Sequence, residues 1–286
     1  MSNSLIMKFI FISILQLIGL ASNTNDQTFI PANPDTYKLV WSDEFNTEGP
    51  PDTGKWKFER GFVRNEEAQW YQHENTVCTG GNLIITGKKE RKLNPNYVKG
   101  SKSWKTNREF IEYTSSSVVM QKEHAFQYGK LEVRAKIDAQ PGLWPAIWTL
   151  GTSGEWPSNG EVDVMEYYDE KILANFAYGS ATRFAAIWDG AAKSVSSFGG
   201  AGWANQFHVW TFEWDENNMR IFIDGELLNT IDLRTTYNKT DGKNPFRQPH
   251  YLLLNQAMGG TRGGSLVNTM LPSKYMIDYV RIYQKE

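Results

Sequence analysis

The chain has 286 residues, a formal net charge of −2 and a sequence pI of about 6.1. This balance lacks the basic excess of nucleic-acid-binding proteins, so we expect no nucleic-acid partner. Aromatic residues make up 14% of the chain and include 11 Trp and 13 Tyr. Aromatic rings offer flat apolar surface with a polar edge, which suits both a packed core and a site that stacks sugar rings.

Residues 1–21 have the pattern of a secretory signal peptide. Lys8 precedes an apolar run over residues 9–18, and a small-residue cleavage site ends at Ala21. The run is short for a membrane span, so we expect no transmembrane segment after removal of the leader. We therefore expect an exported protein, whether periplasmic, at the cell surface or secreted. Residues 22–36 are polar and proline-containing, which predicts a flexible segment before a single catalytic domain over residues 37–286.

Short stretches with strand periodicity follow in chain order, separated by Gly- and Asn-containing turns. Residues 130–137 alternate charged and apolar side chains, as in a strand with one wet face. Residues 207–214 place His208 and three aromatic residues on one face. An Asp-Gly turn between residues 219–223 and 226–228 predicts a β-hairpin. With further strands expected at 251–254 and 276–283, and no long helical periodicity, the fold class is all-β: a two-sheet antiparallel sandwich.

Three carboxylates lie within six residues, at Glu161, Asp163 and Glu166. Their neighbours are β-branched or apolar, so desolvating these acids is costly, which indicates a functional role. In a regular strand Glu166 would face away from the other two. One β-bulge between Asp163 and Glu166 would bring all three to one face. Carboxyls about 5–5.5 Å apart are the pair of a retaining glycosidase. The alternative is a solvated strand face, which has no need of the flanking tryptophans.

Residues 161–166 resemble the signature of glycoside hydrolase family 16 in its longer, bulged form. The resemblance implies a jelly roll with a concave substrate cleft, and an endo-acting, retaining glycosidase. It implies that Glu161 is the nucleophile, Glu166 the acid/base and Asp163 an assisting acid. It also implies a polysaccharide or glycan substrate and no required cofactor, and we expect a monomer. Further similar motifs occur at residues 41–45, 65–71, 128–134, 142–148, 156–160, 254–260 and 277–283.

Aromatic residues near the acidic segment are the candidate sugar-binding side chains. Trp144 and Trp148 share one face of a strand predicted over residues 143–150. Both are expected to contact substrate, and the alternative is that one packs in the core. Trp156 is a candidate for the subsite beside the nucleophile. By the resemblance, Arg64 and Asn65 lie along the glycone side of the cleft, where such groups would orient sugar hydroxyls; the alternative is a loop that satisfies its own backbone.

The four histidines show no metal-ligand spacing, so we predict no catalytic metal. Members of the family often carry a structural calcium ion on the convex side, with Asp278 and the Asp43–Glu44 region as candidate oxygen donors here. Cys78 is the single cysteine and cannot form an internal disulfide, so we expect a small buried side chain.

Two segments outside the acidic motif bear on the choice of substrate. Residues 61–67 and 112–115 resemble gut-bacterial members of the family, some of which cleave galactose linkages in host glycans. This favours an endo-β-galactosidase acting on poly-N-acetyllactosamine or mucin-type O-glycans. The alternative is a β-1,3(4)-glucanase acting on laminarin or mixed-linkage glucan. A sulfated galactan is disfavoured because the chain has no basic excess. An alternative of another class is a secreted carbohydrate-binding lectin, which would have no use for paired carboxylates.

Overall fold

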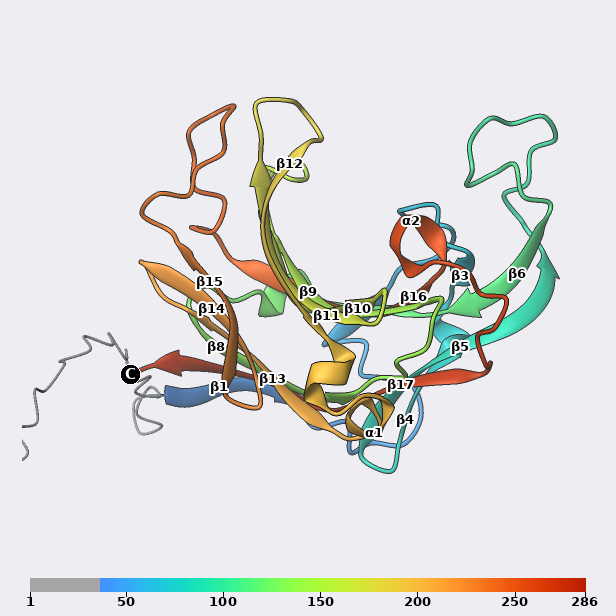
Figure 1. The fold of residues 1–286 in the computed structure, drawn as a ribbon, viewed down its shortest axis with the longest axis horizontal. Helices are drawn as coiled ribbons and strands as arrows, with labels where there is room; N and C mark the ends of the chain where they lie inside the picture. Colours follow the sequence, from blue (N-terminus) through green and yellow to red (C-terminus); the bar gives the residue numbers. More distant parts are fainter. Residues whose placement is uncertain (1–36) are drawn as a thin grey trace, which may run out of the picture. The chain divides into compact units, whose positions relative to one another are not determined.

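The computed structural model describes residues 37–286, which form two large β-sheets and a few short helical turns (Figure 1). The predicted signal peptide and the predicted flexible segment over residues 22–36 lie outside the described residues. Within residues 37–286, no helix has the length and apolar character needed to cross a membrane.

The larger sheet has ten strands among the described residues, and its pairs are antiparallel except for the β3–β6 pair. Strand β1 (Tyr37–Asp43) pairs with β17, and β4 (Thr76–Thr79) pairs with β5. The remaining strands lie in the order β15 (Glu226–Asp232), β14 (Asn218–Ile223), β13 (His208–Trp214), β8 (Gly129–Lys136), β17 (Ser273–Lys285), β5 (Asn82–Leu93), β6 (Phe110–Ser115) and β3 (Gln69–Tyr71).

The second sheet has seven strands, all antiparallel, and it carries the acidic segment on β10. The order is β12 (Ala186–Ser194), β11 (Lys171–Gly179), β10 (Glu161–Tyr168), β9 (Leu143–Gly151), β16 (His250–Met258), β7 (Ser117–Met120) and β2 (Trp56–Phe58). The helical turns are α1 (Ala201–Ala204), α2 (Gly260–Gly263), η2 (His73–Asn75), η3 (Lys122–His124) and η4 (Val195–Phe198). The prediction of an all-β, two-sheet fold is confirmed.

The main core contains side chains from both sheets. Trp210 and Phe212 of β13 belong to the same buried cluster as Val162 of β10 and Phe176 of β11. The alternation predicted for residues 207–214 is observed, because every second side chain of β13 is buried. Burial of a large apolar side chain contributes about 1.5–3 kcal/mol, so this interior fixes which face of each strand points inward. The other face of the seven-stranded sheet remains for the polar side chains of the site.

The predicted hairpin is present, with β14 and β15 joined by Asp224 and Gly225. Both residues have positive φ, 49° and 83°, as a two-residue hairpin turn requires. Cys78 is 3% exposed and belongs to the main core, as expected.

Candidate active site

A β-bulge in β10 brings the three acids to one face. Asp163 pairs with Asn175 of β11 and Glu166 pairs with Leu173, so three steps along β10 match two steps along β11. The register to β9 shifts over the same residues. Val164 and Met165, which lie between the two acids, are both buried in the main core. Two consecutive inward side chains leave Glu166 on the outer face, which is the bulge that the spacing predicts.

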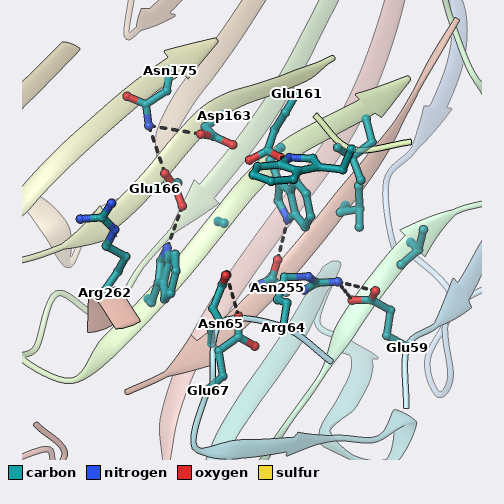
Figure 2. A pocket seen from close by; sticks show the side chains of 18 of the residues that line it. Glu59, Arg64, Asn65, Glu67, Glu161, Asp163, Glu166, Asn175, Asn255 and Arg262 are labelled. Carbon is teal, nitrogen blue, oxygen red and sulfur yellow. Dashed lines mark hydrogen bonds and ion pairs between the residues drawn. The ribbon is translucent and has the colours of Figure 1, made fainter. Parts of the chain in front are cut away.

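The three carboxyls accept hydrogen bonds from two tryptophans and from Asn175 (Figure 2). The indole N–H of Trp156 donates to Oε2 of Glu161 at 2.6 Å, and that of Trp144 donates to Oε1 of Glu166 at 2.7 Å. The side-chain amide of Asn175 donates to Asp163 at 3.2 Å and to Glu166 at 3.1 Å. Glu161 and Glu166 are therefore held by different tryptophans, and Asn175 connects Asp163 with Glu166.

Burial raises the pKa of all three acids. It raises the pKa of Glu166 to about 7, and the charge of Glu161 acts in the same direction. The pKa of Asp163 lies well above its ordinary value because of burial and then because of both glutamates. The pKa of Glu161 is raised by burial, while hydrogen bonds from Asp163 and Trp156 oppose the rise. For Glu166 burial is the larger cause and the charge of Glu161 the smaller one. A proton held by Asp163 can thus stabilise charge on Glu161.

The acids lie in a cleft of about 820 Å³ on the outer face of the seven-stranded sheet. All three predicted tryptophans line it. Trp156 is 37% exposed, whereas Trp144 and Trp148 are each 8% exposed. The indole of Trp148 donates to Oδ1 of Asn255 at 2.6 Å, which fixes the orientation of its ring. Trp156 therefore offers the most open ring of the three to a sugar.

Arg64 and Asn65 also line the cleft, but in different ways. The Arg64 guanidinium forms an ion pair with Glu59 and lies 5.0 Å from the ring centroid of Trp148. Its charge is thus committed to a neighbouring carboxylate, and its contact with Trp148 supports that ring. Asn65 has a φ of 55° and donates to Glu67 at 3.4 Å, which is a long hydrogen bond. The structure brings all eight predicted site residues to one cleft.

Several lining residues were not identified from the sequence. Asn175 is the one polar side chain in the apolar run over residues 172–177 of β11, and its pairing with Asp163 depends on the register after the β10–β11 turn. The cleft is also lined by Glu59, Glu67 and Arg262, which lie far along the chain from the acids of β10. Trp188, 51% exposed on the edge strand β12, also lines the cleft. Of these residues, only Asn175 and Trp188 stand out in the sequence around them.

The candidate donors for a structural calcium ion have other partners. Asp278 forms an ion pair with Arg134, and Glu44 with Arg281. Asp43 accepts a hydrogen bond from the indole of Trp56 at 2.8 Å. These carboxylates are already neutralised or hydrogen-bonded, so this set does not fit a calcium site. Among residues 37–286, no group of three or more His, Cys, Asp or Glu side chains is arranged to hold a metal ion.

Comparisons with known proteins agree with this geometry. The family model for glycosyl hydrolases family 16 matches residues 64–281. A β-glucanase of Rhodothermus marinus is 32% identical over 87% of this chain and 85% of its own length. A keratan-sulfate endo-1,4-β-galactosidase of Sphingobacterium multivorum is 30% identical over 87% of this chain, which spans 55% of that protein.

This chain is also similar to a solved structure from work on endo-acting O-glycanases. Prominent members of the human gut microbiota express those enzymes to initiate mucin breakdown. That structure is 36% identical, with a TM-score of 0.79, and the match covers 89% of this chain and 93% of that one.

Proposed function

Because the chain belongs to glycoside hydrolase family 16 and is an endo-β-glycosidase of that type, we propose that it cleaves internal β-galactoside linkages of poly-N-acetyllactosamine or mucin-type O-glycans with retention of configuration. The observation that carries the mechanism is the bulge that gathers Glu161, Asp163 and Glu166 on one face. The similarity to the O-glycanase structure, at a TM-score of 0.79, supports the mucin-type O-glycan substrate. The similarity to the keratan-sulfate endo-1,4-β-galactosidase supports the galactoside linkage.

The proposed mechanism uses Glu161 as the nucleophile and Glu166 as the acid/base. Glu161 attacks the anomeric carbon as a carboxylate, while protonated Glu166 donates its proton to the leaving glycosidic oxygen. Glu166 then takes a proton from water, and the resulting hydroxide displaces Glu161 and regenerates both groups. A pKa of about 7 suits Glu166 to both steps, because the group can give and accept a proton near neutral pH. Asp163, by holding a proton toward Glu161, would disperse the charge of the nucleophile before attack.

Azide rescue separates the roles of Glu161 and Glu166. With an aryl glycoside that has a good leaving group, Glu166→Ala should still form the glycosyl-enzyme, and azide should then yield the β-glycosyl azide. Glu161→Ala should yield the α-glycosyl azide, because azide replaces the nucleophile directly. On polymer, each variant should lose about 10²-fold or more in kcat. An α-product from Glu166→Ala would exchange the two assignments.

The substrate proposal is tested by product profiles on two sets of polymers. Laminarin and barley β-glucan form one set, and poly-N-acetyllactosamine and mucin O-glycans form the other, with Glu161→Gln as the control for contaminating activity. Oligosaccharides from the lactosamine chains support the endo-β-galactosidase. Products from the glucans alone support the second candidate, a β-1,3(4)-glucanase, which the similarity to the Rhodothermus marinus β-glucanase favours.

The lectin alternative is tested with Glu166→Gln. An enzyme loses turnover and keeps glycan binding, whereas a lectin has no turnover to lose. Hydrolysis by the Gln variant at the parent rate would contradict the assignment of Glu166.

A further inference from the structure

Arg262 is a cationic side chain in the cleft that the mechanism does not use. Three cationic side chains line the cleft among the described residues: Lys57, Arg64 and Arg262. Arg64 is paired with Glu59, and Lys57 lies on β2 at the edge of the sheet. Arg262 extends from α2 toward the side of the cleft where Glu166 lies (Figure 2). Arg262 is an exposed residue, and its side chain makes no hydrogen bond or ion pair within residues 37–286.

The backbone that carries Arg262 is fixed by two neighbouring segments. The amide of Thr261 donates to the carbonyl of Asn65 at 2.9 Å, and that of Gly259 donates to the carbonyl of Gly142 at 2.8 Å. Gly260 has a φ of 69°, and a Cβ there would lie 2.7 Å from the carbonyl oxygen of Asn65. Such close approach requires glycine. The short helix is therefore held against the cleft wall, and its arginine starts from a defined position.

Arg262 lines the same cleft as Glu166, Tyr168 and Trp144. Burial raises the pKa of Tyr168, the charge of Glu166 acts in the same direction, and the charge of Arg262 opposes the rise. The ring of Tyr168 packs edge-on against Trp144, whose indole binds Glu166. A sugar seated beside Glu166 would therefore lie within reach of a guanidinium that has no protein partner. The planar fork of a guanidinium matches the oxygens of a sulfate or carboxylate better than a single hydroxyl.

We propose that Arg262 binds an anionic substituent, a sulfate ester or a carboxylate, on the sugar that lies next to Glu166. This inference rests on the proposed function and narrows its substrate class to acidic galactose-containing glycans. The net charge of −2 argues against capture of a polyanion by a basic surface. A single guanidinium inside the cleft recognises one substituent and needs no such surface.

The test compares paired substrates that differ only in the anionic group. One pair is keratan sulfate and chemically desulfated keratan sulfate, and the other is sialylated and desialylated O-glycan. The parent should show a kcat/KM ratio of about ten or more for the acidic member of one pair, as expected for a charge-assisted hydrogen bond. The pair that shows the preference tells whether sulfate or carboxylate is recognised. Raised ionic strength should reduce the ratio, because salt screens an exposed charge.

Substitutions assign the preference to Arg262. Arg262→Met should bring the ratio close to one, and Arg262→Lys should keep part of it. Lys38→Met is the matched control, because it removes the same charge from the exposed surface of the other sheet and should leave the ratio unchanged. An equal ratio in the parent and Arg262→Met overturns the inference, as does a parent that prefers the neutral member of both pairs.

The same variants separate this inference from the proposed function. If the parent cleaves laminarin and no galactoside chain, the endo-β-galactosidase proposal has failed. The comparison is then made with laminarin and laminarin sulfate. A preference for the sulfated glucan that disappears in Arg262→Met supports the anion site on a glucan substrate, and equal ratios overturn it.

Discussion

The hydrogen bond between Trp144 and Glu166 is expected to set the alkaline limit of activity. The indole N–H donates to Oε1 at 2.7 Å and lowers the pKa of Glu166, because it stabilises the carboxylate. Trp144→Phe removes the donor and keeps a ring that can pack against Tyr168. A hydrogen bond to a charged group contributes about 1.5–3 kcal/mol, and one pKa unit corresponds to about 1.36 kcal/mol, which gives an upper bound of about 1–2 units.

The expected shift is smaller than this bound. The carboxyl keeps the hydrogen bond from Asn175 and faces an open cleft, so part of the lost stabilisation is replaced by water. We expect a rise of about one unit, from about 7 to about 8. A general acid must be protonated in the free enzyme. The alkaline limb of the kcat/KM profile should therefore move to higher pH.

The assay is the pH dependence of kcat/KM on the polymer that the enzyme cleaves. Trp156→Phe is the matched control, because its indole binds Glu161 instead. Loss of that bond should raise the pKa of the nucleophile and move the acidic limb upward. The three acids titrate as a coupled set, so the limbs report apparent values. The reasoning is refuted if Trp144→Phe leaves the alkaline limb in place or moves it to lower pH.

Three further predictions test the groups that support the site. Asn175→Asp replaces a donor to Asp163 and Glu166 with a fourth acid, so kcat/KM at pH 7 should fall about tenfold or more, with Asn175→Ser as the milder comparison. Glu59→Gln leaves the Arg64 guanidinium without its carboxylate, so the free energy of unfolding in urea should fall by about 2 kcal/mol. This is less than the cost for a fully buried pair, because both side chains are 23% exposed. An unchanged urea midpoint would contradict this prediction. His250 is fully buried, and burial lowers its pKa to about 4. The unfolded chain therefore binds the proton first, and stability should fall by about 3 kcal/mol as pH drops from about 6.5 to about 4. In His250→Gln that loss should shrink when urea midpoints are compared at pH 7 and pH 5.

The fold class and the three acids could be predicted because their signals are local. Alternation in residues 207–214 fixes a strand face, and the odd spacing between Asp163 and Glu166 requires one extra residue in the ladder. The partners of the acids could not be predicted in the same way. Asn175 reaches Asp163 only through the register of β10 and β11, and Glu59 reaches Arg64 through a loop whose path no periodicity records.

Arg64 illustrates the limit of reading a side chain's role from its place in a motif. The sequence placed it correctly beside the cleft, and the structure pairs its charge with Glu59 and lays it 5.0 Å from the centroid of Trp148. Arg262 was not predicted, yet it is the exposed cation on the side of Glu166. A motif conveys which residues surround a cleft, whereas ion pairs between distant segments decide which charges remain available to a substrate.

The acidic triad also shows why the site differs from the rest of its strand. A carboxyl whose pKa is raised in the folded state contributes stability at low pH and loses it as pH rises. Burial raises the pKa of Glu161, Asp163 and Glu166 alike. At neutral pH the folded protein must therefore keep protons and buried charges on carboxyls that would all be ionised in water. Apolar neighbours such as Val162 and Val164, both completely buried, anchor the strand against this cost. The alternation of acids and β-branched residues thus reflects a strand with two functions. Its inner face stabilises the fold through apolar burial, and its outer face carries acids that lower the stability at neutral pH.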